Sequence, residues 1–347
     1  MIDDSIRELI DLPRLTAWMN EQPLPMGPVT NVIRLGGGSQ NVILRLTKGG
    51  RDLVLRRPPA SARRESNETM RREARVLSAI ARTSVPHPRL VAACSDETIL
   101  GVAFYLMEPV DGFSAINGMP NLHAGDPAIR HRMGLALVDG AAAIGQVDYL
   151  AVGLDGFGKP QQYLERQVAR WRSQLEGYGR YQGWEGPESL PGLGVIAEYL
   201  DAQRPAGSKP GIIHGDYSIG NVMYRNDGPE LAAIVDWELA TIGDPLIDLG
   251  WILATWRSQT EVDIGVLKVE PFEGFPTAAE LIDRYASQSD RDLSSIDWYV
   301  VLACFKLAII LEGTFARAQA GLDPMTTGLR LHTAAVRLCE RALKRIG

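Results

Sequence analysis

The first hundred residues are dominated by short apolar runs separated by glycines. Between residues 29 and 57, β-prone runs alternate around two Gly-rich points, at 36–38 and 49–50. Short runs interrupted in this way are typical of antiparallel hairpins. A helix is expected before them, over residues 11–19. Three closely spaced prolines follow and would end this helix. The pattern therefore predicts a small N-terminal region rich in β-hairpins.

Apolar positions at helical spacing dominate the rest of the chain. They predict helices over residues 66–81 and 126–147, with one strand at 103–107 between them. A helix followed by a Gly-rich loop is expected over residues 155–194, and the remainder to Gly347 is mostly helical. An antiparallel sheet combined with a larger helical part predicts an α+β fold.

One segment of the chain carries the chemistry. Asp216 and Asn221 stand five residues apart, and Asp236 follows them after a further apolar run. Phosphoryl-transfer enzymes have the same interval between a catalytic Asp and a metal-binding Asn, with a second metal-binding Asp beyond. His-Gly-Asp or Asp-Trp-Glu alone would indicate an ordinary turn. Their combination at this spacing indicates a site for phosphoryl transfer.

The residues between Asn221 and Asp236 predict how these two side chains meet. Two apolar runs flank turn-forming residues at 226–229, as in a β-hairpin. If Arg225 pairs with Leu231, antiparallel pairing brings Asn221 and Asp236 to the same open end. An amide oxygen and a carboxylate are hard ligands of the kind that Mg²⁺ accepts. We therefore expect Asn221 and Asp236 to hold Mg²⁺.

Together with further motifs, this segment resembles the aminoglycoside phosphotransferase family. That family is the antibiotic-kinase branch of the protein-kinase-like fold, which also includes choline kinases. Within it, the chain is similar to kinase-like domains related to the N-terminal parts of acyl-CoA dehydrogenase family members ten and eleven. The motifs that carry this likeness, besides the catalytic segment, lie at residues 36–39, 54–59, 72–77, 105–108, 163–168 and 242–249.

The resemblance implies a two-lobed α+β fold that binds ATP and Mg²⁺. Residues 1–108 would form the nucleotide-binding lobe with the antiparallel sheet, and residues 109–347 the catalytic and substrate-binding lobe. A Gly-rich turn with Gly37, Gly38 and Ser39 would cover the phosphates. The turn lies between two strand-like runs with no helix after it, which disfavours a Rossmann site.

A cation and its acidic partner are expected beside the phosphates. The family places the cation at Arg56, where protein kinases usually have lysine, and arginine can bind phosphate oxygens bidentately. Glu73, in the helix at 66–81, would be its partner. Strand alternation puts Arg56 and Arg57 on opposite faces, so one of them is expected to face solvent. We assign the phosphate contact to Arg56 and expect Arg57 to be the exposed one.

Two further pairs have roles implied by the resemblance. Adenine would be held by the carbonyl of Glu108 and the N–H of Val110, because Pro109 between them has no N–H. Asp244 and Asp248 resemble the acidic pair that braces the catalytic loop of the family.

Composition excludes several other classes of protein. The chain has 347 residues, 45% hydrophobic and 22% charged, and a formal net charge of −6, as expected for an ordinary enzyme. The basic residues at 61–73 are mixed with acidic ones, which argues against a nucleic-acid partner. Three scattered cysteines disfavour a zinc site. The acidic N-terminus and an apolar run at 300–311 interrupted by Lys306 predict a cytoplasmic protein without a membrane partner.

The sequence therefore predicts a kinase that transfers the γ-phosphoryl group of ATP to a hydroxyl on a small molecule, with Asp216 as the base. Two other classes stay open: a nucleotide-binding module without turnover, and a metal hydrolase using His214 and Asp216. ATP or GTP preference and the oligomeric state are not indicated.

Two features of residues 241–330 point to different acceptors. This tract has 13 Asp and Glu against 7 Lys and Arg, a balance of −6 that suits a polycationic aminoglycoside. The subfamily likeness instead implies a hydroxylated acyl substrate, such as a hydroxyacyl-CoA, and we favour this partly apolar acceptor. The tract is also rich in aromatic residues: Trp251, Trp256, Phe272, Phe275, Trp298 and Tyr299.

Overall fold

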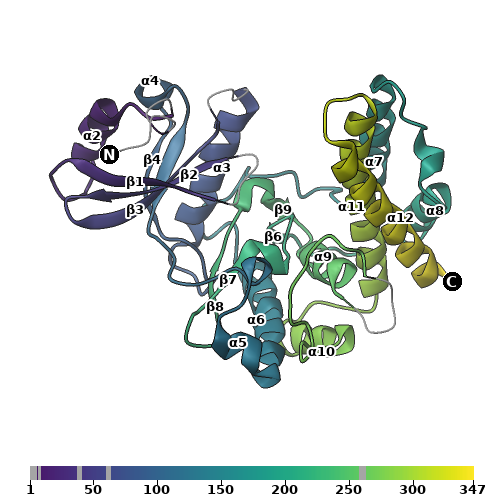
Figure 1. Cartoon of the computed structure of the whole chain (residues 1–347). Helices are drawn as coiled ribbons and strands as arrows, with labels where there is room; N and C mark the ends of the chain where they lie inside the picture. The colour runs from purple at the N-terminus through teal and green to yellow at the C-terminus, as the bar shows by residue number, and fades with distance from the viewer. Residues whose placement is uncertain (1–5, 7–8, 37–40, 60–63, 258–262) are drawn as a thin grey trace. The chain divides into compact units, whose positions relative to one another are not determined.

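The computed structural model describes residues 6, 9–36, 41–59, 64–257 and 263–347 (Figure 1). The chain divides into two compact units. Unit 1 comprises Met1–Gly112, Val152–Leu154 and Ala232–Ala240, and unit 2 comprises Phe113–Ala151, Asp155–Leu231 and Thr241–Gly347. Unit 1 thus extends past residue 108 and takes in two later segments. The lobe boundary expected at 108 stays a prediction.

Unit 1 is built on a five-stranded antiparallel sheet, as the hairpin pattern predicted. Gly49 and Gly50 form the turn between its second and third strands with φ of 56° and 84°, a left-handed conformation that glycine adopts without strain. The strand order is β1-β2-β3-β5-β4. The strands are β1 (Val29–Leu35), β2 (Val42–Lys48), β3 (Arg51–Arg57), β4 (Leu90–Cys94) and β5 (Phe104–Met107).

Alternation along β3 separates two environments in unit 1. Leu53 and Leu55 are completely buried in an apolar core with α2 (Leu12–Asn20), which the Asp11 side chain caps by accepting from the N–H of Arg14. Arg56 lies on the other face of the strand and contacts α3 (Arg64–Ile80). The sheet therefore presents one charged side chain to α3. A third helix of this unit is α4 (Glu97–Leu100).

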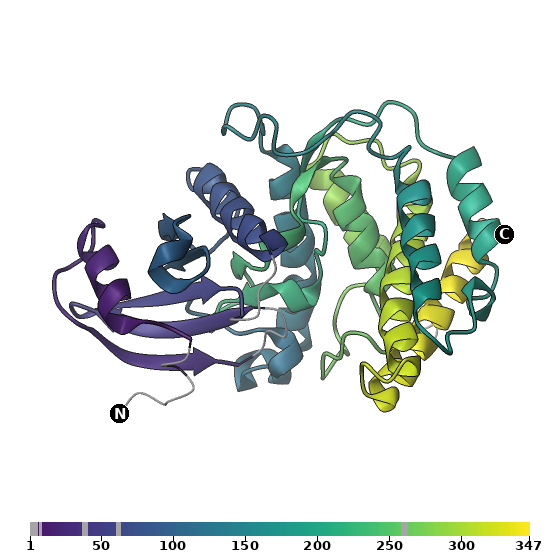
Figure 2. The ribbon, with the colours of Figure 1, turned by 90° about the horizontal axis from the view of Figure 1, so that it is seen from above.

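Unit 2 is mostly helical, as predicted. Its long helix α11 (Ile296–Gln319) packs lengthwise against α12 (Met325–Ile346), and the two lie side by side in Figures 1 and 2. Helix α11 also packs against α9, α7 and α8. The other helices are η1 (Ala115–Asn117), α5 (Asn121–Gly125), α6 (Pro127–Gln146), α7 (Gln167–Glu176), η2 (Gly177–Arg180), η3 (Pro187–Ser189), α8 (Leu193–Ala202), η4 (Ile219–Asn221), α9 (Leu246–Thr255) and α10 (Ala278–Gln288).

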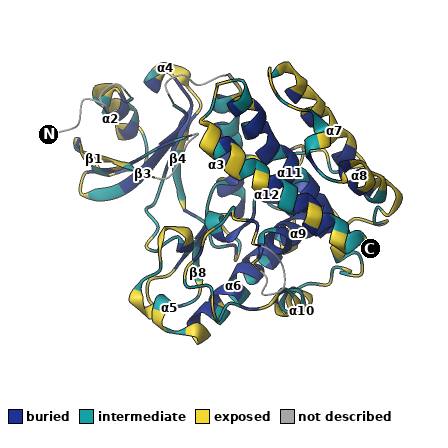
Figure 3. Ribbon diagram, turned by 45° about the vertical axis from the view of Figure 1, so that its right-hand side comes forward, coloured by how far each residue is buried: buried dark blue, intermediate teal, exposed yellow. Residues whose placement is uncertain are grey.

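Helix α11 is the core helix of unit 2. Among the described residues it is the one helix long and apolar enough to suit a membrane span, but 83% of its most apolar window is buried inside the protein. Figure 3 shows α11 and α9 mostly in the dark blue of buried residues. A buried core helix passes the same length and composition test. Its apolar character is therefore explained by packing.

Short strand pairs carry the segments in which the chemistry was predicted. β6 (Gly211–Ile213) pairs antiparallel with β9 (Thr241–Gly243), and β7 (Val222–Tyr224) forms the predicted hairpin with β8 (Leu231–Ile234). The predicted register was wrong by one residue, because the Arg225 N–H donates to the Glu230 carbonyl. The four-residue turn closes more tightly than expected.

The helix expected to begin near residue 155 begins only at Gln167. Residues 155–166 form turns instead. Gly156 has a left-handed φ of 68° and Pro160 follows shortly after, and both disfavour helix propagation. The predictions for 11–19, 66–81, 103–107 and 126–147 are confirmed within one or two residues at most ends.

Candidate active site

Strand β6 delivers the chain to the segment His214-Gly215-Asp216 in unit 2. Gly215 has φ of 89°, where a side chain would be strained, and this explains why glycine precedes Asp216. The Asp248 carboxylate, on α9, accepts from the N–H groups of His214 at 2.7 Å and Gly215 at 2.9 Å. Helix α9 therefore fixes the backbone that leads into Asp216.

Asp248 performs the bracing expected of the acidic pair, whereas Asp244 does not. Burial raises the pKa of Asp248 to about 6, although the two N–H donors lower it. Asp244 accepts instead from the Tyr299 hydroxyl at 2.7 Å and from the Leu246 N–H at 3.0 Å. Asp244 thus connects the start of α9 to α11. The prediction that both residues brace the catalytic loop holds only for Asp248.

Asp216 and Asn221 meet within unit 2. The Asn221 side-chain amide donates to both the carboxylate and the backbone carbonyl of Asp216, each at 2.8 Å. The short helix η4 turns the chain between them, so the five-residue interval returns Asn221 to Asp216. With its nitrogen committed to Asp216, the amide of Asn221 has its oxygen as the atom that could bind a cation.

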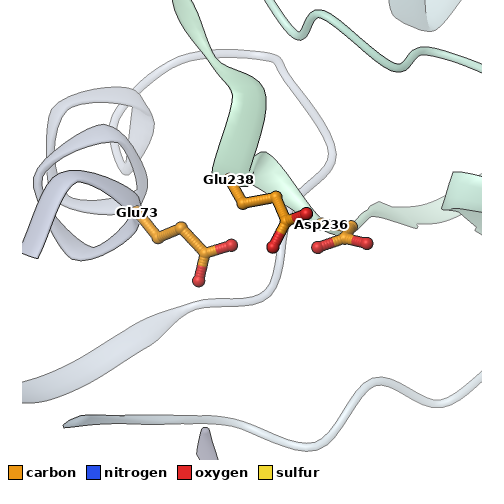
Figure 4. A group of neighbouring side chains, drawn as sticks. All are labelled: Glu73, Asp236 and Glu238. Atoms are coloured by element: carbon orange, nitrogen blue, oxygen red, sulfur yellow. The ribbon is translucent and has the colours of Figure 1, made fainter. Parts of the chain in front are cut away.

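A second polar cluster lies in unit 1 around Arg56. Its guanidinium pairs with Glu73 at 3.0 Å and with Asp236, and it lies 3.9 Å from Glu238. The Tyr105 hydroxyl donates to the other oxygen of Glu73 at 3.1 Å. Figure 4 shows the three carboxylates pointing toward one another, Glu73 from α3 and the other two from the segment containing η5 (Trp237–Leu239).

This cluster holds more negative than positive charge. The carboxylates of Glu73, Asp236 and Glu238 offer oxygens within 4.8 Å of one another, and one guanidinium faces them. Burial raises the pKa of Glu73, Arg56 lowers it and Asp236 raises it, and the resulting pKa is about 7. Burial alone would lower the pKa of Arg56, but the carboxylates outweigh it and raise that pKa. Clustered hard oxygen donors fit a divalent cation such as Mg²⁺.

Glu238 was not singled out as a ligand from the sequence. It follows Asp236 by two residues, and the 3₁₀ turn of η5 brings both carboxylates to one side. The Asn41 amide also donates to Glu238 at 3.2 Å. Asp236 itself has a left-handed φ of 66°, an uncommon conformation for a residue with a side chain, and such strain concentrates at functional sites. The sequence signal that could have identified Glu238 is the second acidic residue of Asp236-Trp237-Glu238.

The expectation that Arg57 faces solvent was wrong. Arg57 is 3% exposed and donates to the backbone carbonyls of Leu9 and Pro58. Arg57 shares the face of β3 that carries the buried Leu53 and Leu55, and the N-terminal segment lies over this face. Burial lowers the pKa of Arg57. Of the two arginines, Arg56 is the one beside the acidic cluster.

The remaining predicted nucleotide contacts stay predictions. Glu108 is held at the end of β5, since its N–H donates to the Arg89 carbonyl at 2.9 Å and its carboxylate accepts from Arg51 at 2.7 Å. Val110 lies two residues further along unit 1. Gly37, Gly38 and Ser39 lie outside the described residues.

The candidate site residues are divided between the two units. Asp216 and Asn221 belong to unit 2, and Arg56, Glu73 and Asp236 to unit 1. The expected sharing of one Mg²⁺ by Asn221 and Asp236 therefore stays a prediction.

The metal-hydrolase alternative gains no ligand set from the described part of the chain. His214 is completely buried, with its ring edge against Tyr217 at 5.7 Å between centroids. The group of three metal-ligating side chains found among the described residues is the carboxylate cluster of unit 1, which has no histidine.

Comparison with known proteins gives the family. A model of the phosphotransferase enzyme family matches residues 31–286. This is more than half of the chain, and the protein belongs to that family. Among curated proteins, acyl-CoA dehydrogenase family member 10 of Mus musculus is 29% identical over 308 residues, which cover 85% of this chain and 27% of that protein. Family member 11 of Homo sapiens is 28% identical over 323 residues, covering 90% and 40%. The chain spans less than half the length of these relatives.

Solved structures agree on the fold. A protein of Ralstonia eutropha JMP134, proposed to be an aminoglycoside phosphotransferase, is 30% identical with a TM-score of 0.79, covering 96% of this chain and 98% of that one. The GDP complex of an aminoglycoside 2'-phosphotransferase is 16% identical with a TM-score of 0.64, covering 97% and 99%. The second likeness bears on the fold alone. The predicted α+β, kinase-like fold is confirmed.

The Arg56 cluster yields a prediction about stability. Glu73→Ala should lower the free energy of unfolding by roughly 3–5 kcal/mol, because Glu73 is completely buried and its loss leaves Arg56 less well paired. Glu68→Ala on the same helix is the matched control, since the Glu68 side chain is 64% exposed beside Arg71. It should change stability by less than about 1 kcal/mol. Denaturant unfolding of both variants measures the difference, and equal losses would contradict the prediction.

Proposed function

We propose that this protein transfers the γ-phosphoryl group of ATP to a hydroxyl on a small molecule, with Mg²⁺ as cofactor. The single observation that carries the proposal is the pair of bonds from the Asn221 amide to Asp216. Membership of the phosphotransferase enzyme family supports it. In phosphoryl transfer the protein mainly positions groups and neutralises charge, and both polar clusters suit these tasks.

Asp216 is assigned to the acceptor. Its carboxylate would orient the attacking hydroxyl and accept its proton. The Asn221 amide fixes the rotation of that carboxylate from one side, and Asp248 fixes the backbone before it. A base held in this way needs little rearrangement when the acceptor arrives.

The acidic residues are assigned to Mg²⁺. Asp236, Asn221 and, as a further candidate, Glu238 would hold the ion, which neutralises phosphate charge when bound. Arg56, kept protonated by Glu73, would supply a fixed positive charge to the phosphates. ATP is the proposed donor. The structures of neighbours include a ternary complex with AMP-PNP and hygromycin B and one with GDP, so either purine nucleotide suits this fold.

The acceptor is proposed to be a hydroxylated, partly apolar metabolite, such as a hydroxyacyl thioester, with an aminoglycoside as the alternative. Part of the acidic excess in residues 241–330 is engaged within the protein. Asp290 pairs with Lys209 and Asp297 pairs with Arg345, and both of these cations lie outside the tract. Asp244, Asp248 and Glu312 are buried. The net charge that a polycation would meet is therefore smaller than the formal balance, which favours the apolar acceptor.

Asp236→Ala should nearly abolish Mg²⁺-dependent nucleotide binding, because it removes a carboxylate from the proposed cation site. Asp227→Ala is the control, since Asp227 is an exposed carboxylate that pairs with Arg225 in the hairpin turn. Calorimetric titration with Mg·ATP measures both. A folded Asp236→Ala protein with wild-type affinity would refute the metal assignment.

Asp216→Asn should separate chemistry from binding. The amide keeps the shape of the side chain but cannot accept the proton, so phosphoryl transfer should slow by ~10²–10⁴-fold while ATP affinity changes little. Asp201→Asn, an exposed Asp beside Arg204, should behave as wild type. Single-turnover transfer and equilibrium binding measure the two quantities. Wild-type turnover in Asp216→Asn would remove Asp216 from the role of base.

Parallel assays of hydroxyacyl-CoA compounds and aminoglycosides decide the acceptor. We expect ATP-dependent phosphorylation of a hydroxyacyl compound, identified by the mass of the product, and little or none of the aminoglycosides. The reverse pattern would establish the alternative. Nucleotide binding without consumption in the presence of any acceptor would favour a binding module without turnover.

A further inference from the structure

Lys306 is an unusual residue for its position. It lies near the middle of α11, where its neighbours Phe305 and Leu307 are buried. An ammonium group surrounded by apolar side chains is costly unless other groups compensate its charge. In the sequence, this lysine only interrupts an apolar run. Its contacts in unit 2 indicate a more specific role for this side chain.

The ammonium of Lys306 contacts the catalytic segment. Its Nζ donates to the backbone carbonyl of Gly215 at 2.7 Å. It also lies 4.3 Å from the ring centroid of Trp251, on α9, and 5.6 Å from that of Trp171, on α7. Aromatic faces at these distances stabilise a cation. The ammonium thus lies near the faces of two indole rings, and it donates to the residue before Asp216.

Four charged groups define the electrostatics at this position. Burial lowers the pKa of Lys306, Arg170 on α7 adds to this effect, and the pKa that results from burial and all the neighbouring charges is about 8. The carboxylates of Asp216, in the catalytic segment, and Asp248, on α9, raise it. The ammonium therefore faces two carboxylates and one guanidinium, and it remains mostly protonated at neutral pH.

Gly215 is consequently held at both of its polar groups. Asp248 accepts from its N–H, and Lys306 donates to its carbonyl. That carbonyl belongs to the peptide unit that joins Gly215 to Asp216, so its orientation sets the direction in which Asp216 leaves the turn. A glycine in a left-handed conformation resists rotation less than any other residue. A buried carboxylate and a half-buried ammonium from different helices replace the restraint that a side chain would supply.

On the basis of the function proposed above, we propose that Lys306 is a positioning residue for phosphoryl transfer, which fixes the Gly215–Asp216 peptide and thereby aims the Asp216 carboxylate. A lysine that only completed the packing of α11 would affect stability. A positioning residue affects kcat at unchanged nucleotide affinity, because small misplacements of a catalytic group are costly.

Three variants separate these roles. Lys306→Met removes the charge and the donor but keeps an unbranched side chain of similar length, and it should lower kcat for ADP formation by about 10- to 100-fold with little change in the KM for Mg·ATP. Lys306→Arg keeps a charged donor and should recover much of kcat. Lys209→Met is the control, because Lys209 is an exposed lysine beside Asp290, with 69% of its side chain accessible. It should retain wild-type kcat.

A pH titration tests the contact without catalysis. Tryptophan fluorescence of the wild-type protein should change with a midpoint near pH 8 as Lys306 loses its proton beside Trp251. The transition should be absent in Lys306→Met. Persistence of the same transition in that variant would assign it to another group and overturn the proposed environment of Lys306.

The outcomes distinguish this proposal from the function on which it rests. A wild-type protein that forms no ADP from Mg·ATP, with acceptors or with water, refutes the proposed function. An active wild-type protein together with a folded Lys306→Met variant of full kcat overturns only the role of Lys306. If Lys306→Met does not fold, Lys306→Leu, which also lacks the N–H donor, takes its place. Full kcat in a folded Lys306→Leu variant would also overturn the role.

Discussion

The buried guanidinium of Arg56 faces more carboxylates than it can neutralise, and much of unit 1 depends on this imbalance. Glu73 arrives from α3, and Asp236 and Glu238 arrive from a segment more than 150 residues later in the chain. Like charges this close repel, so each carboxylate is stable there only because Arg56 or a cation offsets it. The arrangement therefore holds α3, β3 and the late segment together, and at the same time predisposes them to bind positive charge.

In unit 2, charged side chains likewise hold separate segments together, here at a backbone turn. The segment His214-Gly215-Asp216 lies between a buried carboxylate on α9 and a half-buried ammonium on α11, which hold the N–H and carbonyl of Gly215. Burying a charge costs free energy, but a buried charge whose hydrogen bonds are all made holds its partners in a defined geometry. The hydrogen bond from Lys306 to Gly215 also explains why a cation lies in the middle of an apolar core helix.

The sequence predicted the features that depend on local spacing. The interval from Asp216 to Asn221 places both residues on one short turn, so counting residues sufficed. The hairpin after them was predicted for the same reason, and its register failed by one residue because turn length cannot be fixed from composition. Arg57 was assigned wrongly to solvent, although it shares a face of β3 with the apolar Leu53 and Leu55; the segment that supplies its partner, Leu9, is distant in the sequence.

Contacts between distant segments had weaker signals in the sequence. Glu238 required the geometry of η5, and Lys306 required the knowledge that α11 passes beside Gly215. Asp244 and Asp248 lie four residues apart near the start of one helix, yet they bind different partners because one contacts the catalytic segment and the other contacts Tyr299. Similar residues in similar local sequence thus acquire different roles from tertiary packing.

The composition of unit 1 from three separate stretches has a consequence for how the chain can be divided. A fragment ending at Gly112 would contain the whole five-stranded sheet but would lack the segment 232–240. In the intact chain, two hydrogen bonds join this segment to the rest of unit 1. The Ile234 N–H donates to the Pro86 carbonyl, and the Arg72 guanidinium donates to the Ala240 carbonyl. Without this segment, Arg56 would lose its ion pair with Asp236, and the side of α3 that packs against η5 would be exposed to solvent. The sheet is therefore not an autonomous module, and exchange of this region between relatives requires the exchange of a second, distant stretch as well.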